Sequence, residues 1–124
     1  MPKAFLLIAN DEESLALQNI YKALASLGKV EILPYEKAVQ QIMITSYDMV
    51  IVDATLLDSE MTLISKIKTQ QPHTFVLVLS ASPTWRRARD LLKSGADYIS
   101  KSLCEKDYLI AFTEILNRPP HHPS

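Results

Sequence analysis

The feature that most constrains the fold is the regular alternation of short apolar runs with longer segments of helical periodicity. The apolar runs, each short enough to be a strand, cover residues 4–9, 30–33, 49–52, 75–79 and 98–99. The helical segments, in which apolar side chains recur every three or four residues, cover residues 12–27, 36–45, 59–70, 84–94 and 105–117. This order predicts a parallel sheet, because a parallel neighbour is reached only through a crossover connection, usually a helix.

Five strand-then-helix units in a chain of 124 residues predict a single α/β domain. We expect a doubly wound five-stranded parallel sheet of the flavodoxin-like (βα)5 kind, with strand order 2-1-3-4-5. The domain is expected to span residues 1–117. The proline-rich segment 118–124 is expected to be a tail or the start of a linker.

The first helical segment carries a specific packing prediction. Leu15, Ile20, Leu24 and Leu27 are spaced so that they can share one apolar stripe facing the sheet. Gly28 follows this stripe and is expected to end the helix.

Composition argues against several classes of function. The formal net charge is −1, which gives no basis for direct binding to nucleic acid or to an anionic membrane. No apolar run approaches the roughly 20 residues of a membrane span, and the amino end does not have the pattern of a signal peptide. Cys104 is the single cysteine, so an internal disulfide is impossible. We therefore expect a soluble, cytoplasmic protein.

Polar side chains follow four of the five predicted strands. In a sheet of order 2-1-3-4-5, ligands bind at the carboxyl ends of the strands, beside the first and third strands. The residues expected at this rim are Asn10, Asp11, Glu12, Asp53, Ser80 and Lys101. Any one of these residues could be an ordinary polar residue of a solvent-exposed loop. That does not explain why the members of the set have complementary chemistry.

The chemistry of this set suits phosphoryl transfer. Asp11 and Asp53 offer the hard carboxylate oxygens that Mg²⁺ prefers. Asp53 is also a nucleophile of the kind that forms aspartyl phosphates. Lys101 can supply a positive charge, and Ser80 a hydroxyl donor, to the phosphoryl oxygens. Phosphoryl transfer depends mainly on such positioning and charge neutralisation.

Four stretches, FLLIANDEE, YDMVIVDATL, VLVLSAS and GADYISKSL, resemble in their order and spacing the receiver domains of response regulators in two-component signalling. The resemblance covers nearly the whole chain, from Lys3 to about Leu116. It implies that Asp53 is the phosphoacceptor, that Asp11 is a direct metal ligand and that Lys101 is the lysine of the family motif.

The same resemblance implies a switch. Ser80 matches the hydroxyl residue that turns toward the phosphoryl group, and Tyr98 matches the aromatic residue that moves with it. Thr55 stands where receivers lend a backbone carbonyl to the metal. Receivers catalyse their own phosphorylation and slow dephosphorylation, so we do not expect an enzyme with a separate substrate.

Partners and cofactor also follow from the resemblance. The phosphoryl donor would be a phosphohistidine on a histidine kinase or a phosphotransfer protein, and the cofactor would be Mg²⁺ or Mn²⁺. A homodimer through the face made by the fourth helix, fifth strand and fifth helix is a further expectation.

Two positions depart from the family pattern. Asn10 stands where receivers usually have a first acid, so the metal site loses a charge, although Asn10 or Glu12 can contribute through a water. Ser102 stands where receivers usually have a proline with a cis bond, and here we expect a trans bond because a non-proline cis bond costs about 3 kcal/mol.

These departures favour an alternative, a pseudo-receiver that acts as a protein-interaction module without phosphorylation. A second alternative is a small α/β hydrolase with an aspartate nucleophile. That reaction would need a further acid and a cap segment, and the sequence shows no inserted cap.

Overall fold

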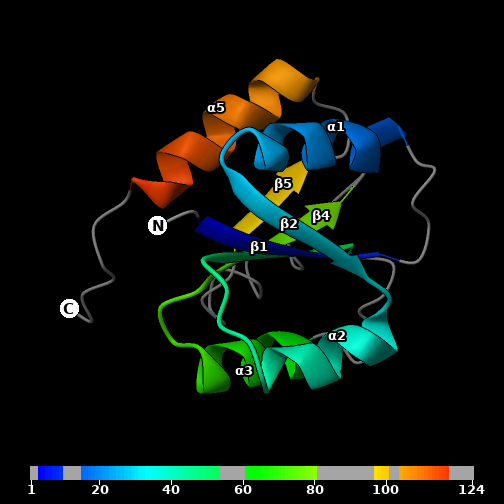
Figure 1. Cartoon of the computed structure of the whole chain (residues 1–124), viewed down its shortest axis with the longest axis vertical. Helices are drawn as coiled ribbons and strands as arrows, with labels where there is room; N and C mark the ends of the chain where they lie inside the picture. Colours follow the sequence, from blue (N-terminus) through cyan, green and yellow to red (C-terminus); the bar gives the residue numbers. More distant parts are fainter. Residues whose placement is uncertain (1–2, 10–14, 54–60, 81–96, 101–103, 118–124) are drawn as a thin grey trace.

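The computed structural model describes residues 3–9, 15–53, 61–80, 97–100 and 104–117 (Figure 1). The strands are β1 (Lys3–Ile8), β2 (Gly28–Leu33), β3 (Met49–Asp53), β4 (Phe75–Ser80) and β5 (Asp97–Ser100). The helices are α1 (Leu15–Ala25), α2 (Tyr35–Ile42), α3 (Met61–Gln70) and α5 (Glu105–Leu116). The predicted helix over 84–94 and the predicted tail 118–124 lie outside the described residues.

The strands pair in parallel, which confirms the α/β class. The sheet runs in the order β2-β1-β3-β4-β5. Register is set by pairs such as Leu7 with Ile32, and Val52 with Val78. Helices α1 and α5 cover one face of this sheet, and α2 and α3 cover the other (Figure 1). Helices α1, α2 and α3 each stand between two consecutive parallel strands, and so form the crossover connections that parallel pairing requires.

Two apolar cores follow from this layering, one on each face of the sheet. Because side chains alternate along a strand, Leu7 and Ile51 enter the core under α1 and α5, whereas Leu6 and Val50 enter the core above α2 and α3. All four side chains are fully buried. The strands therefore read as unbroken apolar runs, as expected for strands that are covered on both faces.

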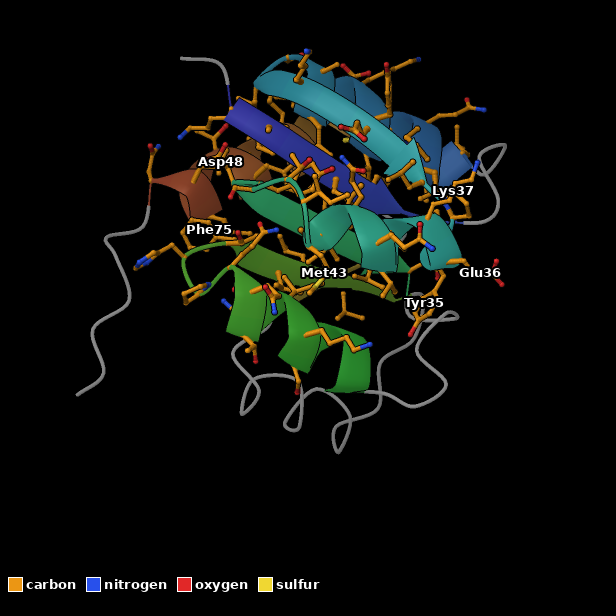
Figure 2. All side chains as sticks on the ribbon, turned by 60° about the horizontal axis from the view of Figure 1, so that its bottom comes forward. Tyr35, Glu36, Lys37, Met43, Asp48 and Phe75 are labelled. Atoms are coloured by element: carbon orange, nitrogen blue, oxygen red, sulfur yellow. The ribbon has the colours of Figure 1, made fainter. Side chains whose placement is uncertain are left out.

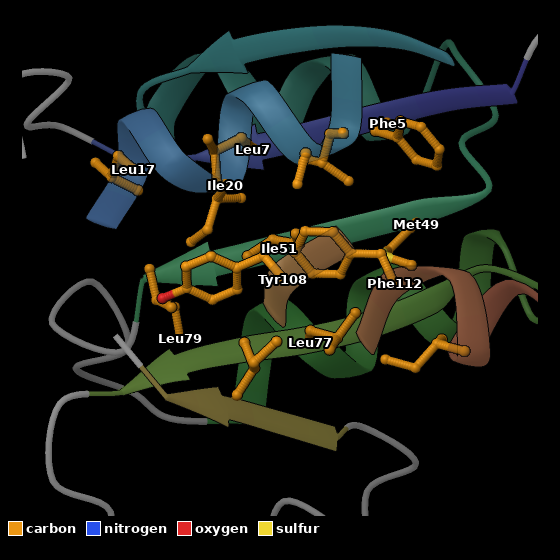
Figure 3. Packing of buried hydrophobic residues seen from close by; sticks show 14 of the residues in the cluster. Phe5, Leu7, Leu17, Ile20, Met49, Ile51, Leu77, Leu79, Tyr108 and Phe112 are labelled. Atoms are coloured by element: carbon orange, nitrogen blue, oxygen red, sulfur yellow. The ribbon is translucent and has the colours of Figure 1, made fainter. Parts of the chain in front are cut away.

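The core beneath α1 and α5 contains a stacked pair of aromatic side chains from α5 (Figure 3). Tyr108 and Phe112, one helical turn apart on α5, stack with ring centroids 5.8 Å apart and an interplanar angle of 14°. Both rings are fully buried. The buried face of α5 thus consists of Tyr108, Phe112 and Ile115, and Leu109 and Leu116 are partly buried against the same core.

The predicted stripe on the first helix was partly wrong. Leu15 is 71% exposed, and the buried face of α1 consists of Leu17, Ile20, Ala23 and Leu24. Leu17, Ile20 and Leu24 follow the three- and four-residue spacing of one helix face. Leu15 is two residues before Leu17, which places it on the opposite side of the helix.

Gly28 has a different role from the predicted one. The helix ends at Ala25, and Gly28 is the first residue of β2, where it pairs with Lys3. A Cβ atom on Gly28 would overlap the Lys3 carbonyl oxygen. The glycine is therefore explained by the close approach of two backbones rather than by a left-handed helix terminus.

The amino-terminal ends of the strands are joined by buried polar side chains. The Gln71 side chain donates to the carbonyl oxygens of Ile42 (2.8 Å) and Thr45 (2.6 Å) and accepts from the Tyr47 amide (2.8 Å). The Thr74 hydroxyl donates to the Tyr47 carbonyl (2.6 Å) and lies 3.0 Å from the Gln71 oxygen. These bonds join the turn between α2 and β3 to the turn between α3 and β4.

Asp48 performs a similar function for the central strands. Its carboxylate accepts from the Ala4 amide (2.8 Å), and its own amide donates to the Ala4 carbonyl (2.8 Å). The Phe75 amide donates to the Asp48 carbonyl (3.1 Å). One residue thus connects the starts of β1, β3 and β4, and Figure 2 shows Asp48 and Phe75 at this end of the molecule.

Replacing Gln71 with leucine should lower the free energy of unfolding by about 3 kcal/mol. The change leaves the Tyr47 amide and two carbonyl groups without their partner, and each such group costs about 1–3 kcal/mol when buried. Urea denaturation followed by circular dichroism measures the difference. The matched control is Gln70→Leu at the exposed neighbouring position, which should change stability little. Equal stability of the two variants would contradict this account.

Candidate functional site

Asp53 is the last residue of β3 and lies half-buried at the carboxyl edge of the sheet. The four residues before it in the strand are fully buried and apolar. By the alternation of β3, Asp53 belongs to the same face as Met49 and Ile51. A carboxylate here is held by a rigid strand yet reaches solvent at the rim, as a nucleophile requires.

The neighbouring strands end beside Asp53. In β4 its partner is Leu79, and Ser80 is the next and last residue of that strand. Strand spacing of about 4.8 Å and a rise of about 3.3 Å per residue put the Ser80 backbone roughly 6 Å from that of Asp53. On the other side, β1 ends at Ile8, which pairs with Val52. The strand ends that the sequence placed at one rim therefore do lie at one rim.

Several predicted site residues lie outside the described residues. These are Asn10, Asp11, Glu12, Thr55 and Lys101. Ser80 and Tyr98 are placed by their strand positions, with Tyr98 paired to Val78 and Ser80 paired to Ser100. That Asp11 and Lys101 lie close to Asp53 thus remains a prediction. The structure shows where β1 and β5, the strands that precede these two residues, end.

A half-buried lysine lies at the opposite edge of the sheet. Lys68 on α3 donates from Nζ to the Thr74 carbonyl at 2.9 Å, just before β4 begins. Burial lowers the pKa of Lys68, and the nearby Asp97 carboxylate acts in the opposite direction. Thr74 comes just before the start of β4, whereas Asp53 is the last residue of β3. Lys68 therefore lies at the other end of the strands from Asp53 and cannot take the role predicted for Lys101.

A cavity of about 320 Å³ lies between α1 and β2, and it is distinct from the rim at Asp53. Its lining residues are Leu7, Leu17, Gln18, Tyr21, Lys22 and Ile32. The cavity arises where α1 meets β2, the edge strand of the sheet. None of these described lining residues is a predicted site residue.

The described ranges hold neither a cluster of metal-ligating side chains nor a membrane-spanning helix. No group of three or more histidine, cysteine, aspartate or glutamate residues is gathered there as for a metal ion. Among the same residues, no helix is long and apolar enough to cross a membrane. The predicted carboxylate ligand Asp11 lies outside the described residues.

No protein-family model and no curated protein sequence matches the chain. Solved structures do match. A response regulator from Thermotoga maritima is 25% identical, with a TM-score of 0.82 over 95% of this chain and 100% of that one. The chain has the fold of a response-regulator receiver domain.

Two further structures show how widely this receiver fold is used. A Burkholderia pseudomallei response regulator, solved with a phosphorylated aspartic acid, a calcium ion and citrate, is 21% identical (TM-score 0.67, 94% of this chain and 75% of that one). A putative pilus assembly protein from Sinorhizobium meliloti is 19% identical (TM-score 0.70, 89% and 97%). At these identities the likeness concerns the fold alone, and function must be argued from the residues at the rim.

Proposed function

We propose that the chain is a phosphoacceptor switch of two-component signalling in which Asp53 receives the phosphoryl group. The observation that carries this proposal is the position of Asp53, half-buried at the carboxyl edge where β1, β3 and β4 end together. The proposed reaction needs a carboxylate nucleophile at the carboxyl ends of the strands. Asp53 supplies it from β3, which is held in place by its pairing with β1 and β4.

In the proposed reaction, an Asp53 carboxylate oxygen attacks the phosphorus of a phosphohistidine. A P–O bond to Asp53 forms while the P–N bond to the imidazole breaks, and the imidazole leaves with that electron pair and takes up a proton. The lysine and serine proposed for the rim, Lys101 and Ser80, would interact with the phosphoryl oxygens. The donor would be a histidine kinase or a phosphotransfer protein.

The switch proposal extends to the surface of the molecule. An aspartyl phosphate adds negative charge beside the end of β4, where Ser80 is the last strand residue. Tyr98 lies on the next strand, paired with Val78, and would move with Ser80. A change at these two positions would alter the face around β5 and α5, the proposed site for output and for a homodimer. We place this switch in the cytoplasm, where its donor would be found.

A divalent cation is part of the proposal. The carboxylate chemistry of the rim fits Mg²⁺ or Mn²⁺, since Asp53 and the proposed ligand Asp11 both offer hard oxygen atoms. The Thr55 backbone carbonyl, together with Asn10 or Glu12 through a water, would complete the protein ligands. A bound cation neutralises charge on the phosphoryl oxygens. The receiver fold of the Burkholderia response regulator carries both a phosphorylated aspartic acid and a calcium ion, which supports this pairing.

The second candidate is an interaction module that keeps the receiver fold without phosphorylation. Asn10 and Ser102 favour it, because both replace residues that receivers usually have at the site. The pilus assembly protein with this fold supports a use outside response regulators. Phosphorylation and metal binding distinguish the two candidates.

Incubation with acetyl phosphate and Mg²⁺ should add one phosphoryl group to the wild-type chain, measured as intact mass. Asp53→Asn should abolish the labelling because the amide is not a nucleophile. Asp107→Asn, at an exposed carboxylate on α5, is the matched control and should be labelled like wild type. An unlabelled wild-type chain, under conditions that label a known receiver, would favour the interaction module.

Addition of Mn²⁺ should broaden the NMR amide signals of residues 8–9, 53 and 79–80. Amide signals of Thr45 to Tyr47 and of Gln71, His73 and Thr74 should broaden far less, because these residues precede β3 and β4 at the opposite end of the strands, roughly 13 Å or more away. Asp11→Asn and Asp53→Asn should each weaken the effect at least tenfold, since each removes a charged ligand. Uniform broadening of both edges would argue against a metal site at the rim.

A further inference from the structure

The cavity between α1 and β2 has no part in the proposed phosphoryl transfer. Its aliphatic walls are Leu7 of β1, Leu17 of α1 and Ile32 of β2. Leu7 and Leu17 are buried members of the core beneath α1 (Figure 3), and Ile32 packs against the same core. The cavity is thus an unfilled extension of the apolar core, located at the edge strand of the sheet.

The size of the cavity suits a small organic molecule. Its volume is about 320 Å³, and ligand pockets usually have volumes of about 300–1,000 Å³. An engineered apolar cavity of about 150 Å³ is enough to admit benzene, so roughly twice that volume admits an apolar body of about ten to twelve carbon atoms. Water beside aliphatic walls finds no hydrogen-bond partner in them. An apolar group that displaces such water therefore gains affinity.

Three side chains of α1 stand at the mouth of this cavity. Gln18, Tyr21 and Lys22 line it and are exposed, whereas the aliphatic walls are buried or half-buried. Lys22 is the one charged residue among the described lining residues. The stem of a lysine can lie along an apolar wall while its ammonium group stays in water. A positive charge thus stands beside an apolar interior.

The described segments that form the cavity bring no carboxylate to its mouth. Neither α1 nor β1 contains an acidic residue. The acidic residue of β2, Glu31, alternates with Ile32 and therefore points to the opposite face of the sheet. There it interacts with Tyr47, a buried residue of the core above α2 and α3. Within these segments, the Lys22 ammonium has no acidic neighbour at the cavity and can pair with an anionic ligand.

We propose that this cavity binds a small apolar carboxylate, with an apolar body of about ten to twelve carbon atoms and one anionic group. The apolar body fills the space between Leu7, Leu17 and Ile32. The carboxylate stays at the mouth and pairs with the Lys22 ammonium. A neutral molecule leaves this charge without a partner, and a cation is repelled by it. A doubly charged anion finds no second cation among the described lining residues.

This site goes beyond the proposed phosphorylation and does not depend on it. The described lining residues include neither Asp53 nor Ser80. Binding requires no metal and no phosphoryl donor, so Asp53→Asn should bind the carboxylate as wild type does. Failure of either proposal is therefore distinguishable from failure of the other.

The test follows the backbone amide NMR signals of the whole chain during titration with 2-naphthoate to millimolar concentration, without metal or phosphodonor. The signals of Leu7, Ile32 and residues 17–22 should shift and saturate. Those of Ile64 and Ile67, in the core on the other face of the sheet, should not. A parallel titration with decanoate compares a flexible chain with a flat ring, and saturable binding of either probe at these residues supports the proposal.

The role of Lys22 is tested with 2-naphthamide, the neutral isostere of 2-naphthoate. Wild type should bind the carboxylate about threefold more tightly than the amide, as expected for an exposed ion pair. Lys22→Gln should remove this difference. Lys29→Gln is the matched control and should keep it, because Lys29 is exposed on β2 and alternates with Ile32 like Glu31. Ile32→Phe should weaken binding of both probes at least tenfold, because it fills the cavity.

Four other outcomes overturn the proposal. The first is the absence of saturable shifts with both carboxylates, and the second is a set of shifts centred away from the cavity. Equal binding of 2-naphthoate and 2-naphthamide by wild type would mean that the cavity does not recognise charge. Loss of the difference in Lys29→Gln as well would attribute it to overall charge rather than to Lys22. Circular dichroism checks the fold of each variant, and the signal mapping and the two lysine variants decide the question even if Ile32→Phe does not fold.

Discussion

The parallel pairing of β3 with β1 and β4 is the constraint on which the rest of the molecule depends. Because all strands run in one direction, every carboxyl end lies at one edge of the sheet and every amino end at the other. The first edge carries Asp53, and the second carries Asp48, Gln71 and Thr74. In the described part of the molecule, the polar groups that stabilise the fold thus lie at one end of the strands. Asp53, the carboxylate proposed to react, lies at the other end.

Much of the sheet could be predicted from the sequence because each strand is covered on both faces. A run such as Met49 to Val52 must then be apolar at every position, and this signal is hard to miss. Asp53 stood out for the same reason, since it ends such a run. The first helix was harder, because Leu15 and Leu17 both fit an apolar pattern. Only the packing shows that Leu17 is buried while Leu15 is exposed.

The buried hydrogen bonds of the Gln71 and Thr74 side chains could not be predicted from the sequence. Gln71 and Thr74 flank Pro72 and so resemble an ordinary wet turn, although both side chains are buried. Their importance depends on partners more than 20 positions away, such as the Tyr47 backbone. For the candidate site, the sequence predicted which strand ends meet. The meeting of Asp11 and Lys101 with Asp53 depends on loop conformations that strand register alone does not determine.

The attachment of α2 and α3 has a mechanical consequence. Both helices are secured at their final turns, where the Gln71 side chain binds the Ile42 carbonyl and its amide binds that of Ile67. Loss of the Gln71 side chain would therefore loosen the ends of α2 and α3 together, so local opening of the two helices should be coupled.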